Sequence, residues 1–364
     1  MAGSTFGTIF RITTWGESHG EGVGVIVDGV PSGIPLEQND IQEMLDKRRP
    51  GQSQYTTPRN ESDTVSILSG VFEGKTTGTP ISLFVKNKTQ RSKDYSEIAS
   101  YYRPGHADYT YHKKYDHYDY RGGGRSSGRE TIGRVAAGAI AKKILHLLGI
   151  SVVAYTTSIG PIGISSFCKE DIEKNPFRMP DLDAAKQTEQ FVQEQMKQLN
   201  SVGGVIECVV SNLPTGLGEP VFEKLDANLA KAIMSIGAVK GFEIGDGFLA
   251  STQTGLEHND GFFNDNGTIK KRTNHSGGVL GGISDGSPLI LRAAIKPTPS
   301  IAALQKTVTK DLEEIDISIK GRHDPLIVPR AVVVIEAMTA ITILDALLLN
   351  MTSQFDRVKQ FYDK

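Results

Sequence analysis

The stretch Gly70–Pro80 reads GVFEGKTTGTP and has a second copy at Gly278–Pro288, which reads GVLGGISDGSP. The two copies align without a gap and share three glycines, a valine and the final proline. Glycine and proline at such spacing predict tight turns between short strands. Because the copies lie far apart in the chain, we interpret them as equivalent parts of two repeated halves.

Two further pairs of stretches match in the same order. VIVDGVPSGIPL from Val25 resembles VVSNLPTGLGEP from Val209, and the arginine-bearing loop before the helical pattern at Val135 corresponds to GRHDP before the pattern at Ala331. Unrelated Gly-Pro turns could produce one match, since such turns recur in most β proteins. Three matches favour a single domain, 1–364, with an internal duplication of roughly 20–150 and 205–350. We expect a pseudo-twofold α+β fold in which each half supplies a sheet and long helices.

Composition argues against several classes of protein. The formal net charge of -2 disfavours a general binder of polyanions. Cys168 and Cys208 have no metal-ligand spacing and suit a reducing compartment. The chain does not open with a basic segment followed by an apolar run, so we expect no signal peptide. The apolar stretch Ala331–Met351 contains Glu336 and Asp345 and predicts a buried helix, not a membrane span. We expect a cytoplasmic protein without membrane contact.

The segment from Arg103 to Gly149 combines arginines, glycines and a helix start. Gly122–Gly124 allow the backbone to approach a ligand closely. Ser127 and Glu130 have the spacing of a capping box, and Gly149 ends the helical pattern that follows. Free N–H groups at such a helix start, flanked by arginines, favour a phosphate or a carboxylate. An ordinary capped core helix with solvated arginines remains the alternative.

Three familiar patterns fail on inspection. Gly70–Thr76 has three residues between its glycines where a P-loop needs four. Gly20–Gly24 does not fit the dinucleotide-binding pattern and leads into a strand. His112, Asp116 and His117 lack a further ligand at a diagnostic spacing. We therefore expect no P-loop, no Rossmann site and no metal site.

Three loops place a titratable side chain beside glycine or proline: Gly16–Gly20 (GESHG), Arg103–Asp108 (RPGHAD) and Gly321–Pro325 (GRHDP). Loops on rigid scaffolds commonly carry functional groups. Together with the anion-binding helix start, these loops favour an enzyme that handles a phosphorylated substrate. The interleaved aromatic, arginine and glycine residues of Tyr118–Arg125 leave a second class open, a non-catalytic polyanion-binding or RNA-binding protein.

These loops and their surroundings resemble the chorismate synthase family over nearly the whole chain. The matching motifs, in the family's order, are GESHG, RPGHADYTY, YRGGGRSSGRET, MSIGAVKG, LGGIS, KPTPSI and GRHDP. The resemblance implies a lyase of the shikimate pathway, which serves aromatic amino-acid biosynthesis. Such an enzyme converts 5-enolpyruvylshikimate 3-phosphate to chorismate by 1,4-elimination of phosphate, with reduced FMN required but not consumed. The resemblance also implies long helices between two antiparallel β-sheets, a homotetramer and an association with NADP.

The resemblance assigns roles to individual residues. His19 matches the acid for the departing phosphate, His106 the histidine that manages a proton on reduced flavin, and Asp324 the aspartate that relays the ring proton. The residues that match flavin contacts are Arg125, Ser126, Ser127, Ala238, Gly281, Lys296, Pro297, Thr298, Ser300 and Arg322. Those that match substrate-anion ligands are Arg48, Arg49, Arg103 and Arg129.

Three positions depart from the family's pattern. Gln54 stands where a substrate-binding arginine is common, Gly237 where close relatives have an FMN-contacting asparagine, and Pro299 in a loop that usually reads KPTSS. Arg59 is a candidate to replace the contact missing at Gln54, and backbone groups can serve the flavin at the other two positions. The resemblance leaves open whether the protein reduces its own FMN or relies on a separate flavin reductase.

Overall fold

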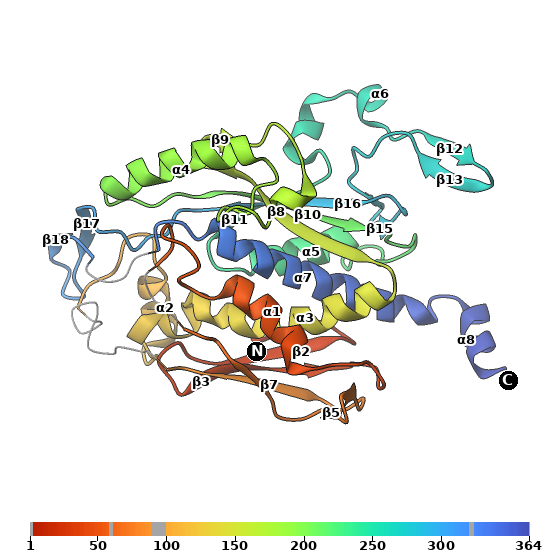
Figure 1. Ribbon diagram of the computed structural model, residues 1–364, viewed down its shortest axis with the longest axis horizontal. Coiled ribbons are helices and arrows are strands. Elements are labelled where there is room, and N and C mark those ends of the chain that lie inside the picture. Colours follow the sequence, from red (N-terminus) through yellow and green to blue (C-terminus); the bar gives the residue numbers. More distant parts are fainter. Residues whose placement is uncertain (1–2, 58–60, 89–99, 320–323, 364) are drawn as a thin grey trace.

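The computed structural model describes residues 3–57, 61–88, 100–319 and 324–363. Within these ranges two five-stranded sheets enclose a layer of helices (Figure 1). The strand order is β1-β2-β3-β7-β4 in the first sheet and β11-β16-β10-β8-β9 in the second, and all neighbours are antiparallel. The predicted fold of long helices between two antiparallel sheets is confirmed.

The first sheet consists of β1 (Thr5–Phe6), β2 (Arg11–Gly16), β3 (Gly22–Asp28), β4 (Val65–Ile67) and β7 (Ile81–Lys86). The second consists of β8 (Ser151–Ile159), β9 (Ile162–Gly163), β10 (Gly204–Ser211), β11 (Val239–Ile244) and β16 (Leu289–Ile295). Four two-stranded ribbons pair β5 (Val71–Phe72) with β6 (Lys75–Thr76), β12 (Phe262–Asp265) with β13 (Thr268–Lys271), β14 (Val279–Leu280) with β15 (Ile283–Ser284), and β17 (Gln305–Val308) with β18 (Glu314–Ile317).

The enclosed layer is built on the crossing of two helices, α3 (Thr131–Leu147) and α7 (Val328–Leu349). They meet at Gly138, where an added Cβ would lie 2.3 Å from the Cβ of Ala337. Helices α1 (Gln38–Arg48) and α5 (Leu225–Met234) complete the layer. Outside it lie α2 (Asp108–Tyr115), α4 (Leu182–Lys197), α6 (Gly255–His258) and α8 (Phe355–Tyr362).

Helix α7 is the central core element. The span Val328–Thr352 is long and apolar enough to cross a membrane by composition alone, but 72% of its most apolar window is buried in the fold. Its two acidic residues have partners: Glu336 pairs with Lys142 of α3 at 2.5 Å, and Asp345 accepts three backbone N–H bonds from residues 8–10 at 2.8 to 2.9 Å. The buried helix predicted for this stretch is therefore confirmed.

The two halves repeat the same connections. In chain order, β2, β3, β4 and β7 are arranged as β2-β3-β7-β4, and β8, β10, β11 and β16 as β8-β10-β16-β11. The hydroxyl of Thr76 donates to the carbonyl of Pro31 at 2.6 Å, and that of Ser284 donates to the carbonyl of Pro214 at 2.6 Å. We propose, from these matching bonds, that residues of roughly 20–150 and 205–350 are duplicated halves of one domain.

The predicted start of α3 is wrong in detail. Ser127 caps a short 3-10 turn, Gly128–Glu130, by accepting from the backbone of Arg129 at 3.4 Å. The carboxylate of Glu130 instead accepts from the Thr14 hydroxyl of β2 and pairs with Arg134, at 2.9 and 2.8 Å. Because these partners occupy Glu130, no capping box forms. The predicted end at Gly149, whose φ is +76°, is confirmed.

Candidate active site

A glycine turn before α3 lies against the first predicted histidine. Gly122–Gly124 all have positive φ, within the 3-10 segment Arg121–Ser126. A Cβ added at Gly122 would lie 2.3 Å from Cδ2 of His19, and the hydroxyl of Ser18 donates to the Gly122 carbonyl at 3.0 Å. Only glycine fits this approach, which places the GESHG loop directly on the turn.

The second predicted histidine lies against the next glycine. A Cβ added at Gly123 would lie 3.6 Å from Cε1 and 3.8 Å from Nε2 of His106. Nδ1 of the His106 imidazole lies 2.7 Å from the Asp108 carboxylate. The same carboxylate accepts two hydrogen bonds from the Arg103 guanidinium, at 2.7 and 2.8 Å. Burial alone would raise the pKa of Asp108, but the hydrogen bonds from Arg103 and His106 hold it far below its usual range. His19 and His106 therefore face adjacent residues of one turn.

Two predicted arginines are buried at the start of α3. Arg48 donates to Asp63 at 2.9 Å, and Arg129 pairs with Asp63 at 3.1 Å and with Glu61 at 2.8 Å. Burial lowers the pKa of Arg48 to about 10, with Asp63 acting in the opposite sense and the neighbouring Arg330 and Arg129 adding to the fall. The Arg48 guanidinium thus remains charged at neutral pH.

The third predicted catalytic residue borders these arginines. Asp324 pairs with Arg330, and Arg330 also donates to the Arg48 carbonyl at 3.0 Å. Burial raises the pKa of Asp324, although Arg330 and Arg48 act in the opposite sense. Residues 321–323 of the GRHDP motif lie outside the described residues, and the predicted flavin ligand Arg322 is among them.

Asn87 connects the histidine loop to the arginines. Its amide donates to the carbonyls of Glu17 and Gly20 at 3.0 and 2.9 Å, and its oxygen accepts from Arg129 at 3.0 Å. Asn87 is buried, so the connection is fixed. Four polar atoms of predicted site residues are buried without a hydrogen-bond partner among the described residues: Arg48 Nε, Arg129 Nη2, Thr298 Oγ1 and Asp324 Oδ1. Such atoms indicate where a polar ligand would be accepted.

The Lys296–Ser300 loop reaches the same region from the second half. The ammonium of Lys296 donates to the Gly105 carbonyl at 2.6 Å, one residue before His106. Ala238, which has φ of +73°, accepts from the Lys296 backbone at 2.9 Å. An added Cβ at Gly105 would lie 3.4 Å from Pro299. Loops from both halves thus meet at the RPGHAD loop. In the same Lys296–Ser300 loop, Pro297 lies beside Gly203, and the Thr298 carbonyl accepts from the Ser201 hydroxyl at 2.7 Å.

Other predicted residues are placed differently. Arg49 is exposed and lies 3.9 Å from Asp46. The Arg125 guanidinium is directed at β2, where it donates to the Thr14 hydroxyl at 2.8 Å. The Ser126 hydroxyl donates to the carbonyl of Gly123 at 2.7 Å. In this segment the backbone is thus left as the part available to a ligand.

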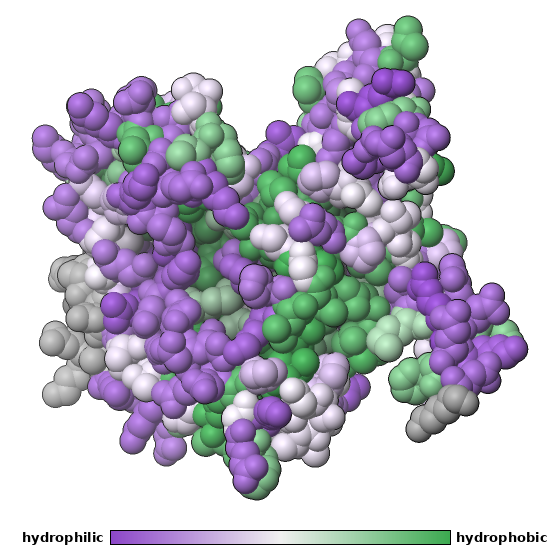
Figure 2. Space-filling model, turned by 45° about the vertical axis from the view of Figure 1, so that its right-hand side comes forward, coloured by the Kyte–Doolittle hydropathy of each residue, from purple (hydrophilic) through white to green (hydrophobic). Residues whose placement is uncertain are grey.

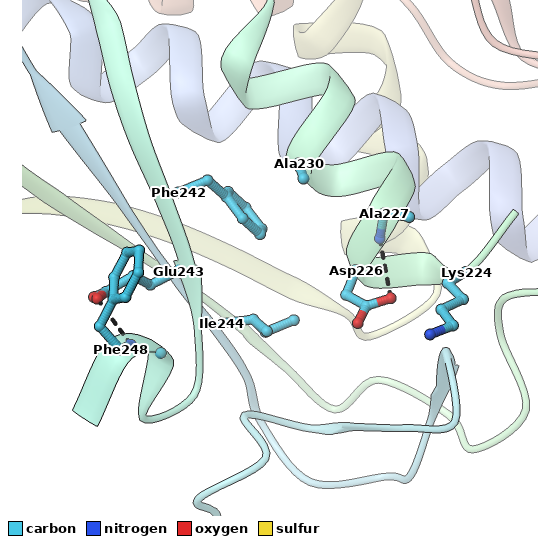
Figure 3. Close-up of a pocket in the computed structure, with 9 residues that line it drawn as sticks. Lys224, Asp226, Ala227, Ala230, Phe242, Glu243, Ile244 and Phe248 are labelled. Atoms are coloured by element: carbon cyan, nitrogen blue, oxygen red, sulfur yellow. Dashed lines mark hydrogen bonds between the residues drawn. The ribbon is translucent and has the colours of Figure 1, made fainter. Parts of the chain in front are cut away.

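Gly281 is not brought to the site within one chain. It lies in the β14–β15 hairpin that precedes β16, whereas Lys296 follows the other end of that strand. Seven residues of β16 separate the two ends, which is on the order of 20 Å at the usual rise per residue. A shallow hollow of about 490 Å³ lies at the end of β16 that is near Gly281 (Figure 3). Lys224, one of its lining residues, contacts Gly282. Phe242 and Ile244 of β11 form its apolar wall.

The departures from the family's pattern have visible consequences. The Gln54 amide donates to the Tyr55 hydroxyl at 2.6 Å, and that hydroxyl donates to Glu189 of α4. Gln54 is thus bonded to a hydroxyl that in turn contacts α4. Arg59 lies outside the described residues. At Gly237 an added Cβ would meet nothing within 4 Å, so no packing constraint requires glycine there.

Several residues of the site were not predicted from the sequence: Glu61, Asp63, Asn87, Asp108 and Arg330. Asp108 is in the RPGHAD motif, two residues after His106, and this spacing was the available signal. The other four lie in segments without a motif, and only folding brings them to the arginines and to Asp324. Among the described residues, no group of three or more His, Cys, Asp or Glu side chains could hold a metal ion.

Comparison with known proteins identifies relatives over the whole chain. A family model described as chorismate synthase matches residues 10–348. The chain is 67% identical to a chorismate synthase of Agathobacter rectalis, with 100% of both chains covered, and 55% identical to one of Methanococcoides burtonii, with 95% and 96% covered. A crystal structure of a chorismate synthase superimposes with a TM-score of 0.77 and 31% identity, covering 98% of this chain and 97% of the other.

Proposed function

The chain belongs to the chorismate synthase family, and from this premise we propose that it is a lyase that converts 5-enolpyruvylshikimate 3-phosphate to chorismate and phosphate. The reaction is a 1,4-elimination in which the substrate loses a ring proton and its phosphate. Reduced FMN, when bound, supplies electron density that amino-acid side chains cannot provide.

One observation carries this proposal: His19 and His106 lie against adjacent glycines of one turn, and the nearby buried arginines have N–H groups without a partner in the described part of the chain. Breaking a carbon–oxygen bond to phosphate requires a proton donor and fixed positive charge near the leaving group. His19 is the donor to the departing phosphate. Arg48 and Arg129 supply the charge, and Asp63 holds both in place.

We assign the remaining substrate contacts to Arg103 and Arg49 and the proton relay to Asp324, and the surroundings of Arg103 and Asp324 support their part of this assignment. Arg103 is held by Asp108 beside His106, and Arg49 lies at the exposed end of α1. Asp324 takes up the ring proton by relay, because its raised pKa makes the carboxyl a better proton acceptor than an ordinary aspartate. With reduced FMN bound, His106 would hold or release a proton at Nε2.

The flavin-binding surface has contributions from both halves of the fold. Its first part is the backbone of Arg125–Ser127 beside the positive-φ glycines, where a chain without side chains can approach a planar group closely. Its second part is Ala238 with Lys296–Ser300, including the Thr298 hydroxyl, which has no hydrogen-bond partner within the ranges that the structure describes. Arg322 is assigned to this surface by the family pattern alone.

Gly281 can reach this surface only from a second copy of the chain. This requirement supports the homotetramer implied by the family. Exposed apolar side chains at the end of the molecule where α3 and α7 terminate, including Leu147, Leu148 and Met351, support an interface there (Figure 2). We assign the protein to the cytoplasm. Reduced FMN comes either from the protein's own reduction of FMN, with NADP, or from an external flavin reductase.

Phosphate release tests the function. Anaerobic protein with chemically reduced FMN and 5-enolpyruvylshikimate 3-phosphate should release phosphate and form chorismate in equal amounts. No release under these conditions would rule out the lyase. Salt-sensitive RNA binding without flavin binding would instead support the non-catalytic alternative suggested by Tyr118–Arg125.

A further inference from the structure

Asp108 lies at the first residue of α2 and connects Arg103 to His106. One carboxylate oxygen, Oδ1, lies 2.8 Å from Nη2 of Arg103 and 2.7 Å from Nδ1 of His106, while Oδ2 accepts from Nε of Arg103 at 2.7 Å. We propose that Asp108 is a positioning residue that fixes the tautomer and orientation of His106, so that only Nε2 is available for proton exchange at the glycine turn. The catalytic meaning of this arrangement rests on the proposed lyase function.

The tautomer follows from the donors and acceptors around Nδ1. A carboxylate accepts only and a guanidinium donates only. An unprotonated Nδ1 would repel the Asp108 oxygen at 2.7 Å, so Nδ1 must carry a hydrogen and donate it. The 3.1 Å distance between Nδ1 and Nη2 of Arg103 then separates two donors that share one acceptor. Nε2 is then the ring nitrogen left for proton exchange, since Nδ1 is engaged by Asp108.

The orientation follows from the packing on both sides of the ring. A Cβ added at Gly123 would lie 3.8 Å from Nε2 and 3.6 Å from Cε1, so these two ring atoms face the glycine turn. The backbone before His106 is fixed by Lys296, which donates to the Gly105 carbonyl at 2.6 Å. The His106 side chain is 17% exposed, so a ligand over the turn can reach it. Asp108 therefore acts from the side of the ring that faces away from the turn.

A purely structural role for Asp108 would involve Arg103 alone. In that case the carboxylate would anchor the arginine at the start of α2, and the state of the His106 ring would not depend on it. The two roles make different predictions for Asp108→Asn. Arg103 would claim the one remaining acceptor oxygen, and the new amide N–H would donate to Nδ1, which forces the hydrogen to Nε2.

The test reads the ring nitrogens of His106 directly. Full-length protein labelled with ¹⁵N-histidine is studied by solid-state NMR with and without oxidised FMN, and the His106 signals are assigned by their absence from His106→Gln. We expect the Nδ1–H tautomer in the wild type and the Nε2–H tautomer in Asp108→Asn. This readout needs no turnover, so it stands or falls independently of the lyase assignment.

Turnover provides the second readout. Asp108→Asn should lower kcat on the order of 10²- to 10⁴-fold, as expected for a base held in the wrong tautomer, with a much smaller change in KM. Asp108→Glu should restore part of kcat. Arg103→Lys should raise KM and leave the Nδ1–H tautomer in place. Asp116→Asn, at the exposed far end of α2 where φ is +56°, is the matched control and should match the wild type in both readouts.

Two results would overturn the proposal. One is an Nε2–H tautomer in the wild-type protein. The other is an Asp108→Asn variant that fails to behave as predicted: either its His106 ring nitrogens and its kcat are unchanged, or Arg103→Lys shows the same loss of kcat while its own His106 tautomer stays that of the wild type. If Asp108→Asn does not fold, Asp108→Glu decides, because a longer carboxylate must displace the ring and shift the Nδ1 signal if the bond exists.

Discussion

Two carboxyl groups of the site have their pKa values moved in opposite directions. The pKa of Asp108 lies well below its usual range because Arg103 and His106 donate hydrogen bonds to its carboxylate. Asp324 is protonated to higher pH than usual because it is buried, with Oδ1 unpartnered among the described residues. Such opposed environments separate a group that stays charged from a group that exchanges protons. At the scale of residues, Asp108 therefore positions its neighbours, and Asp324 is suited to take up a proton.

Asp324→Asn separates the chemical role of this carboxyl from its structural one. The amide oxygen can still accept from Arg330, so we expect FMN and substrate affinity within about threefold of the wild type, whereas loss of the proton acceptor should lower turnover by about 10²-fold or more. Because the pKa of Asp324 is raised in the folded protein, ionisation of this carboxyl destabilises the fold as the pH rises. The Asp324→Asn side chain cannot ionise, so the variant should not have lower thermal stability than the wild type at pH 8. Ligand titration, turnover and melting are measured together. Normal turnover would exclude the proton relay.

At the residue level, the sequence gives a prediction where a motif marks a loop. His19, His106 and Asp324 are predicted because each stands beside glycine or proline in a family motif, and their catalytic roles stay predictions. Asp63 and Asn87 could not be identified in this way. Each acts by bridging segments that are far apart in the chain, and their stretches carry neither periodicity nor a motif that would indicate the bridge.

At the scale of elements, the helical spacing of apolar residues predicted the core helices, but it did not predict the side-chain contacts at the helix ends. The capping box at Ser127 and Glu130 follows a local rule. Its failure has a tertiary cause, because β2 places the Thr14 hydroxyl within reach of Glu130. The close approach of α3 and α7 was equally hidden, since a glycine inside a helical pattern shows only that packing or function could require it.

Gly138→Ala tests that approach. Alanine is the better helix former by about 1 kcal/mol, so a solvent-exposed site would be stabilised. Here the added methyl group would lie 2.3 Å from Cβ and 2.6 Å from Cα of Ala337, and the helices must separate. We expect a net loss of about 1 to 3 kcal/mol in the free energy of unfolding, measured with denaturant.

Gly255→Ala, at the first residue of α6, is the matched control for this experiment. Its added Cβ would approach nothing closer than 4.0 Å, so we expect a change within about 0.5 kcal/mol. A Gly138→Ala variant as stable as this control would mean that the crossing tolerates a larger separation than the structure indicates.

At the scale of the whole molecule, the repeated stretches of sequence indicate a duplicated architecture. The equivalence extends to single positions, because Gly281 in the β14–β15 hairpin corresponds to Glu73 in the β5–β6 hairpin. Both residues have positive φ, +60° and +48°. What the sequence could not show is that Gly281 stands at the opposite end of β16 from Lys296. Motif order along a chain carries no information about which subunit supplies a residue.

Gly281→Glu uses this equivalence to test whether two chains build one site. The counterpart Glu73 shows that glutamate fits the turn, so the variant should fold with a stability cost of about 1 kcal/mol, yet it should lose FMN affinity and activity. His106→Gln should be inactive for a different reason. Co-expressed, the two variants form mixed assemblies in which a Gly281→Glu chain keeps its own His106 and receives Gly281 from its neighbour. Activity should then recover to about one quarter of the wild type for random pairing across a twofold interface.

Glu73→Gly is the matched control and should keep full activity. Mixed assemblies as inactive as the parents would place Gly281 outside any shared site, because no other combination of these chains leaves both residues intact in one site.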